Sequence, residues 1–178
     1  MGNPAGLPAG RQARPFLMND IYEVFDQLNI SYKKYDHPAV FTVEESKKYK
    51  IKTEGANTKN LFLTNQKKTA YYLVSVLAAK RVDLKKLAED LKEDRFSFAS
   101  PEDMKNFLGL TPGSVSPYGL INNKNHQVTA VVDNDFFDYE KVGFHPNVNT
   151  ATVVISVEDF KKFLESTGNR VVYCNFKQ

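Results

Sequence analysis

The chain has 178 residues, of which 42% are hydrophobic and 25% are charged, and these are the proportions of one ordinary globular domain with a good core. Its 24 basic and 21 acidic side chains give a formal net charge of +3, and no apolar run approaches the length needed to cross a bilayer. This composition argues against a membrane protein and against strong whole-molecule attraction for a polyanion, so any contact with nucleic acid has to come from a local patch.

The first 17 residues differ from the rest of the chain. They are rich in Gly, Pro and Ala, and they carry Arg11 and Arg14 but no acid. Because they lack the apolar core of a secretory signal, we interpret residues 1–17 as a disordered leader or cloning remnant, with a weak organelle-targeting peptide as the alternative. Residues 18–178 are predicted to form one domain. Cys174 is the only cysteine, so no intrachain disulfide can form, which fits a cytoplasmic protein.

The predicted elements begin with a helix that Asn19 or Asp20 can cap, because apolar residues then recur at helical spacing. Residues 31–35 form a short predicted strand that ends at His37-Pro38. The segment Thr42-Val43-Glu44-Glu45 fits a capping box, in which a hydroxyl and a carboxylate bind the exposed amides at a helix start. A short basic helix or turn is expected after it.

A β-hairpin is predicted next, because residues 58–64 and 70–76 flank a polar turn. Asp83 and Ser100 are predicted caps of two following helices, and proline after Ser100 fits the first helical position.

Two central strands are expected at residues 128–132 and 152–155, a helix capped by Ser156 follows, and residues 170–173 form an edge strand. Strands and helices are mixed without regular βαβ alternation. The pattern therefore favours an α+β fold, with a mixed sheet packed by helices, over a doubly wound one.

Several familiar catalytic patterns are missing from the sequence. It contains no phosphate-binding loop, no dinucleotide fingerprint and no Gly-x-Ser-x-Gly nucleophile elbow. Three histidines and one cysteine argue against a zinc site, and we predict no metal and no cofactor. Cys174 has no basic neighbour in sequence, so we interpret it as a part-buried residue of the edge strand rather than a catalytic thiol.

Lys59 and Asn60 stand at the mouth of what otherwise looks like a buried apolar strand. Most strand-end lysines are simply solvated, but lysine is rarely buried without a partner, and the polar flanks here favour a site. A compact ammonium group at a pocket rim can hold a phosphate or polarise a carbonyl.

Two further segments are predicted to converge on Lys59. Residues 113–117, Gly-Ser-Val-Ser-Pro, are either an ordinary loop or a nest whose backbone N–H groups stabilise an oxyanion. His145 and Asn147, separated by a proline, are either surface residues or groups that orient a ligand hydroxyl. Together these segments predict a pocket for a small anionic or carbonyl-bearing ligand.

Three segments in this order resemble a known family: residues 37–45 (HPAVFTVEE), 59–63 (KNLFL) and 111–120 (TPGSVSPYGL). They are similar to the YbaK/ProX aminoacyl-tRNA deacylases, free-standing relatives of the editing domain of bacterial prolyl-tRNA synthetases. The resemblance covers about residues 19–166. It implies a single domain with a mixed, partly closed, largely antiparallel sheet surrounded by helices. Residues 144–152 (FHPNVNTAT) resemble the branch that removes alanine from mischarged proline tRNA.

The resemblance also implies roles for individual residues, in a reaction without a protein nucleophile. The predicted catalytic residues are Lys59, Asn60, Gly113, Ser114 and His145. The predicted substrate-binding residues are Val40, Phe41, Thr42, Glu44, Val115, Ser116, Pro117 and Asn147. The predicted tRNA contacts, most of which are solvated side chains on the alternative interpretation, are Lys47, Lys48, Lys50, Lys67, Lys68, Lys80 and Arg81.

The leading functional hypothesis is a trans-editing hydrolase for Ala-tRNA(Pro). One alternative is a deacylase for Cys-tRNA(Pro) or Ser-tRNA(Ala). Another is a non-catalytic module that binds aminoacyl-tRNA or a synthetase. The predicted partner is a mischarged proline tRNA, with a prolyl-tRNA synthetase as a second candidate.

Overall fold

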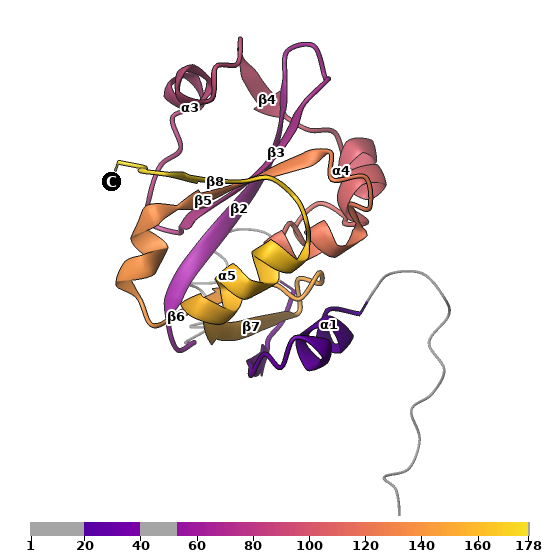
Figure 1. Ribbon diagram of the computed structural model, residues 1–178, viewed down its shortest axis with the longest axis vertical. Coiled ribbons are helices and arrows are strands. Elements are labelled where there is room, and N and C mark those ends of the chain that lie inside the picture. The colour runs from indigo at the N-terminus through magenta and orange to yellow at the C-terminus, as the bar shows by residue number, and fades with distance from the viewer. Residues whose placement is uncertain (1–19, 40–52, 178) are drawn as a thin grey trace, which may run out of the picture.

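The computed structural model describes residues 20–39 and 53–177 (Figure 1). The predicted leader and the capping box at Thr42 lie outside these residues. The helices are α1 Ile21–Gln27, α3 Leu84–Leu91, α4 Pro101–Leu108 and α5 Val157–Ser166, with 3-10 helices η1 Pro117–Asn122 and η2 Asn134–Asp138. The strands are β1 Lys33–Asp36, β2 Ala56–Asn65, β3 Tyr71–Leu77, β4 Phe96–Phe98, β5 Val128–Asp133, β6 Lys141–Phe144, β7 Ala151–Ser156 and β8 Val171–Cys174.

The described strands form one mixed sheet in the order β1-β7-β6-β2-β3-β5-β8, and β4 pairs with β2 off this path. The pairs β2–β6, β3–β5 and β5–β8 are parallel, and the other pairs in this part of the chain are antiparallel. The predicted α+β class with a mixed sheet and surrounding helices is confirmed. The sheet is open, however, where we expected partial closure, because β1 and β8 end the path without pairing with each other.

The predicted helix starts are confirmed by their caps. Asp20, Asp83 and Ser156 each accept hydrogen bonds from backbone N–H groups of the first helical turn. Ser100 forms a full capping box with Asp103, with Pro101 in the first turn. These polar residues satisfy amides that have no partner inside the helix, which fixes where each helix begins.

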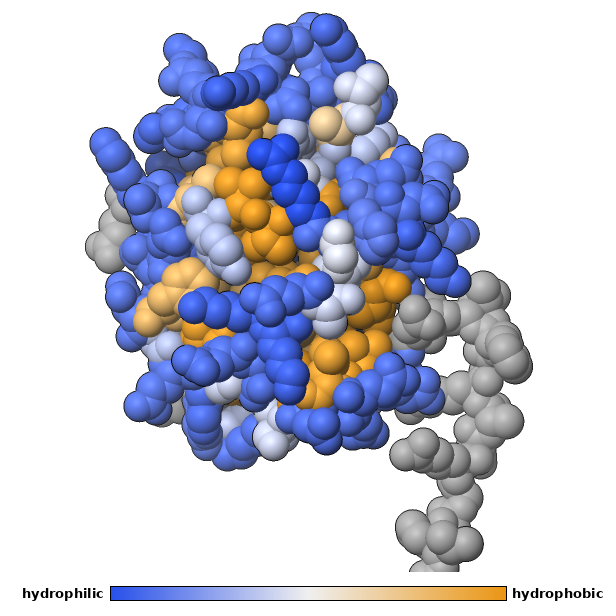
Figure 2. Space-filling model, in the orientation of Figure 1, coloured by the Kyte–Doolittle hydropathy of each residue, from blue (hydrophilic) through white to orange (hydrophobic). Residues whose placement is uncertain are grey.

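Two apolar clusters pack on the two faces of the β2–β3 hairpin. Side chains alternate along a strand, so Phe62 and Leu73 face the larger cluster, whereas Leu63 and Val74 face a smaller one under α3. Helix α5 lies along β6 and β7 and adds Phe160 to the larger cluster (Figure 1). Hydrophilic residues cover much of the face in Figure 2, with hydrophobic patches between them. Within residues 20–39 and 53–177, no helix has both the length and the apolar character to cross a membrane.

Strand β2 connects the two halves of the sheet. It pairs with β3 over residues 58–64, with β6 at residues 56–57 and with β4 at residues 63–65. On the β4–β6 side, residues 58–62 therefore have no strand partner in the described part of the chain. Lys59 and Asn60 lie in this gap.

Four short elements were not predicted from the sequence: β4, β6, η1 and η2. A three- or four-residue strand shows too few alternations to give a clear period, and 3-10 turns have no strong periodic signal.

Candidate active site

Lys59 and Asn60 leave β2 on opposite faces. Side chains alternate along a strand, and Lys59 shares its face with Leu61 and Leu63, whereas Asn60 shares its face with Phe62. The contacts agree with this alternation. Asn60 reaches the loop at residues 113–117, and the Lys59 ammonium group donates to the carbonyl of Lys80, after β3. The structure therefore joins Asn60 to the predicted loop and draws Lys59 toward the end of β3.

The Asn60 side chain uses both ends of its amide. Its Nδ2 donates to the carbonyl of Val115 at 3.1 Å, and its Oδ1 accepts from the Ser75 hydroxyl at 2.7 Å. The strand register places Ser75 directly opposite Asn60 on β3. Asn60 thus links both strands of the hairpin to the middle of the loop.

His145 and Asn147 hold two other points of the same loop. The His145 ring hydrogen-bonds to the backbone of Gly113. Asn147 has φ of 62°, a left-handed conformation that asparagine tolerates better than most residues, and its Nδ2 lies 3.4 Å from the carbonyl of Tyr118. The structure therefore brings Asn60, His145 and Asn147 onto one segment, residues 113–118, which we call the anchored loop.

The end of the anchored loop is fixed in the core. Tyr118 is fully buried, and its ring contacts the rings of Phe25, Phe144 and Phe163 edge-on, at centroid distances of 5.2, 5.6 and 5.2 Å. Such edge-to-face contacts add to the hydrophobic gain of burial. The loop is therefore held both by polar side chains and by packing.

The two loop serines use their hydroxyl groups within the loop. Ser114 Oγ donates to the Thr111 carbonyl at 2.8 Å, and Ser116 Oγ accepts from the Tyr118 amide at 3.2 Å. Both residues are buried, and in the described part of the chain no hydrogen bond joins either hydroxyl group to a histidine ring. Their geometry fits loop positioning rather than nucleophilic attack.

His145 is uncharged at neutral pH. Burial, with a smaller contribution from nearby His37, lowers the pKa of His145 to about 4. The His37 and His145 rings lie 5.8 Å apart, and His37 is itself held by Thr152 Oγ1 at 3.0 Å. His37 was not among the residues predicted to form the site. Its presence in the first family-like segment was the signal that it lies near the site.

Lys80 is not a tRNA contact, which corrects the sequence prediction. Its side chain is 1% exposed, and its Nζ lies 2.8 Å from Asp133 Oδ1 and 2.6 Å from Asp135 Oδ2. Burial opposes a charge there, but the hydrogen bonds to the two carboxylates outweigh it and raise the pKa of the Lys80 ammonium group. Lys80 therefore anchors the segment after β3, and its carbonyl receives Lys59.

No metal site is evident among the residues that the structure describes. No group of three or more His, Cys, Asp or Glu side chains there could hold an ion. Burial raises the pKa of the Cys174 thiol on β8, which disfavours a reactive thiolate.

A model of the aminoacyl-tRNA editing domain matches residues 37–163 of the chain. The chain belongs to the aminoacyl-tRNA editing domain family. It is 38% identical over 144 residues to the prolyl-tRNA editing protein ProX of Acetoanaerobium sticklandii, covering 81% of this chain and 88% of that protein. It is also 37% identical over 153 residues to the prolyl-tRNA synthetase associated domain-containing protein 1 of Bos taurus, covering 84% and 89%. The predicted YbaK/ProX resemblance and the predicted enzyme class are confirmed.

The fold of this editing domain also matches a solved structure described as a candidate trans-editing enzyme for prolyl-tRNA synthetase. The two chains are 21% identical, with a TM-score of 0.64 and coverage of 89% of this chain and 95% of the other. This likeness supports the fold, which carries the anchored loop and β2 in the arrangement given above.

Three of the other predicted tRNA contacts are exposed: Lys67, Lys68 and Arg81, of which the two lysines lie in the β2–β3 turn. Seven predicted site residues lie outside the described part of the editing domain, so their roles stay predictions. They are the substrate-binding residues Val40, Phe41, Thr42 and Glu44 and the tRNA contacts Lys47, Lys48 and Lys50.

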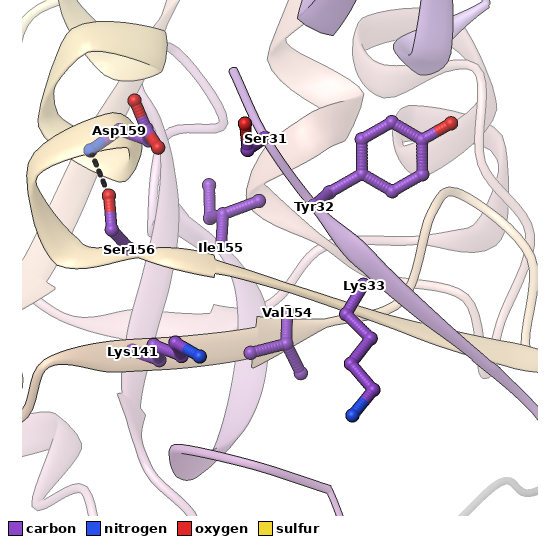
Figure 3. A pocket seen from close by; sticks show the side chains of 8 residues that line it. All are labelled: Ser31, Tyr32, Lys33, Lys141, Val154, Ile155, Ser156 and Asp159. Carbon is purple, nitrogen blue, oxygen red and sulfur yellow. Dashed lines mark hydrogen bonds between the residues drawn. The ribbon is translucent and has the colours of Figure 1, made fainter.

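A depression of about 300 Å³ lies elsewhere on the editing domain (Figure 3). Segment 31–33, strands β6 and β7 and the start of α5 line it, and none of the predicted site residues does. The two lysines on its rim, Lys33 and Lys141, are both paired with Glu54 at 2.5 and 3.0 Å. This depression is therefore separate from the anchored loop.

Proposed function

We propose that this editing domain hydrolyses, in trans, the ester bond of mischarged proline tRNA, with Ala-tRNA(Pro) as its substrate. One observation carries the proposal: three side chains from two separate segments hold the backbone of residues 113–118 at Gly113, Val115 and Tyr118. A loop fixed in this way can present backbone groups to a small aminoacyl ester. The ProX relative, which is named as a prolyl-tRNA editing protein, supports the choice of tRNA.

The proposed reaction uses no protein nucleophile. The hydroxyl groups of Ser114 and Ser116 are buried and already bound within the loop, and the Cys174 thiol lies on β8 with a raised pKa. An aminoacyl ester is an activated bond, so positioning and carbonyl polarisation can supply much of the rate acceleration. A held water molecule, oriented by a ribose hydroxyl of the tRNA, then attacks the ester carbonyl, and the bond from the acyl carbon to the ribose oxygen breaks to release the free amino acid and the tRNA.

His145 acts in this proposal as a neutral positioning group. A pKa of about 4 leaves the imidazole uncharged at neutral pH, so it holds the Gly113 backbone without repelling the cationic amino group of the substrate. An imidazolium there would place a second positive charge beside that ammonium.

Lys59 is the proposed contact for the terminal adenosine rather than for the acyl group, because it leaves β2 on the face opposite Asn60 and the anchored loop. Its ammonium group donates to the Lys80 carbonyl, which holds the positive charge in place beside residues 58–62 of β2. A compact cation held in this way can bind a phosphate of the tRNA.

Selection of alanine over proline is proposed to depend on size. Favourable contact with one extra methylene gives only about 1–3 kcal/mol, so steric exclusion has to supply much of the discrimination. A pocket that closes just beyond a methyl group excludes the proline ring by overlap.

A panel of charged tRNAs tests the proposal. Initial deacylation rates are measured for Ala-tRNA(Pro), Cys-tRNA(Pro), Ser-tRNA(Ala) and Pro-tRNA(Pro) with the full chain. We expect Ala-tRNA(Pro) to be hydrolysed fastest and Pro-tRNA(Pro) to be spared. A higher rate with Cys-tRNA(Pro) or Ser-tRNA(Ala) would reassign the substrate, and retention of tRNA with no ester loss over hours would show a binding module. Association with a prolyl-tRNA synthetase and a cytoplasmic location are further predictions.

A further inference from the structure

Ser75 is a buried hydroxyl-bearing residue in an otherwise apolar strand. It is 2% exposed, and its neighbours Leu73, Val74 and Val76 on β3 are all buried and apolar. A buried hydroxyl is costly unless it is hydrogen-bonded, and the described partner of Ser75 is the side chain of Asn60. The hydroxyl therefore serves Asn60 rather than the backbone of the sheet.

Two partners together hold the Asn60 amide in one orientation. The Val115 carbonyl can only accept a hydrogen bond, so the amide nitrogen faces it, at 3.1 Å. The Asn60 oxygen then lies on the side of β3, where the Ser75 hydroxyl donates to it at 2.7 Å and completes the pair of hydrogen bonds. With the opposite orientation, two oxygen atoms would face each other and the loop would lose its central attachment.

Val115 is where this attachment meets the proposed pocket. Its carbonyl is held by Asn60, and its half-buried side chain packs against the larger apolar cluster. The position of Val115 therefore depends on the side-chain amide of Asn60. A shift of the loop at Val115 would change the space available to an acyl group.

We propose that Ser75 is a positioning residue that sets acyl-group selectivity, acting through Asn60 on the position of Val115. This inference rests on the proposed function, because it assumes that the anchored loop borders the acyl pocket. Loss of the hydroxyl group releases the Asn60 amide, loosens the loop at its centre and opens the pocket to a larger acyl group.

A matched pair of variants separates this role from a general loss of stability. Ser75→Ala removes the hydroxyl under test. Thr64→Val is the control, because Thr64 is also buried in the hairpin and its hydroxyl donates to the Ala70 carbonyl at 3.1 Å, away from the loop. Thermal unfolding of both variants shows whether their stabilities are comparable.

The first measurement needs no substrate. Amide hydrogen exchange over residues 111–120 of the free protein is compared among wild type, Ser75→Ala and Thr64→Val. We expect exchange in this segment to rise about five- to tenfold in Ser75→Ala alone, as loss of one buried hydrogen bond implies. Equal exchange in the two variants would show that Ser75 does not hold the anchored loop in position.

The second measurement is the ratio of the deacylation rates for Ala-tRNA(Pro) and Pro-tRNA(Pro). We expect this ratio to fall about five- to tenfold in Ser75→Ala and to stay within twofold of wild type in Thr64→Val. On an Asn60→Ala background, Ser75→Ala should change the ratio no further, because its effect passes through Asn60. Additive effects on that background, or an unchanged ratio in the single variant, would overturn the proposal.

The outcomes distinguish this inference from the proposed function. If wild type hydrolyses neither ester, the proposed function is wrong, whereas the exchange measurement still decides whether Ser75 positions the loop. If wild type is active and selective but Ser75→Ala behaves like Thr64→Val, only the role of Ser75 is wrong.

Discussion

Adjacent residues Asn60 and Lys59 are held by different chemistry on the two faces of β2. On the Asn60 face the contacts are neutral: the hydroxyl of Ser75, the side-chain amide of Asn60 and the carbonyl of Val115. On the Lys59 face they end in an ion pair between buried Lys80 and buried Asp133, to which partly exposed Asp135 adds a second carboxylate. A neutral hydrogen bond contributes about 1 kcal/mol and can adjust, whereas a buried charge is tolerated only with a complete partner set. Loss of one contact should therefore cost little stability on the Asn60 face and much more on the Lys59 face.

The largest expected effect is on stability, from removal of the Lys80 ammonium group that pairs with Asp133. Lys80→Met leaves Asp133, which is 0% exposed, without its cation, and should lower the free energy of unfolding by about 3–5 kcal/mol. Urea denaturation measures this loss. The control is Lys86→Met, which breaks the exposed Lys86–Asp90 pair and should cost less than about 1 kcal/mol. Similar losses in both variants would contradict the structural role of Lys80.

The next largest effect is on catalysis, from substitution of Lys59, which lies on the face of β2 that leads to Lys80. Lys59→Ala should lower the rate of Ala-tRNA(Pro) deacylation about 10²–10³-fold, the range for loss of one preorganised electrostatic group. Steady-state kinetics with circular dichroism to verify folding gives the comparison. Full activity in this variant would end the assigned role of Lys59.

The uncharged His145 beside the anchored loop should make the stability of the protein depend on pH. The pKa of His145 is about 4 in the folded protein and about 6.5 in an unfolded chain, so the unfolded state binds more protons between these values. Stability should therefore be full above pH 6.5 and fall by up to about 3 kcal/mol as the pH drops to 4. Denaturant titrations across this range measure the slope. His145→Gln should flatten this slope, and an unchanged slope in that variant would contradict the assignment.

The smallest expected effect lies outside both networks. Lys67→Gln with Lys68→Gln should raise KM for tRNA about two- to fivefold and leave kcat unchanged, because exposed lysines act through screened attraction for phosphate. The effect should shrink as salt increases. Exposed Lys86→Gln serves as the control, and a matching rise in KM there would mean that the β2–β3 turn has no special contact with tRNA.

The helices and strands could be predicted from the sequence better than the arrangement of the site residues. Helix caps such as Asp83 and Ser100 have local causes, so their positions could be predicted from neighbouring residues. The hairpin of β2 and β3 was equally clear. Short β4 and β6 were missed because three or four residues show too few alternations, and because each also pairs with β2, much earlier in the chain.

The site was predicted as a set of residues but not as an arrangement. Lys59 and Asn60 were expected to face one pocket, although the two-residue period of a strand already separates them. Lys80 was grouped with surface lysines because Asp133, more than 50 residues away, gives no local signal. Ser75 was not singled out, since its partner is known only once the register of the hairpin is known.

The alignment of β2 against its neighbours has a consequence for how this enzyme tolerates change. The Thr58 hydroxyl donates to the Gly143 carbonyl at 2.6 Å, which fastens the start of β2 to β6. A slip of one residue would exchange the directions of every later side chain on the strand. Lys59 would then point toward the anchored loop, and Asn60 would point toward Lys80 and its carboxylate partners. A single residue inserted before Lys59 would therefore break the Asn60–Val115 and Lys59–Lys80 contacts at the same time.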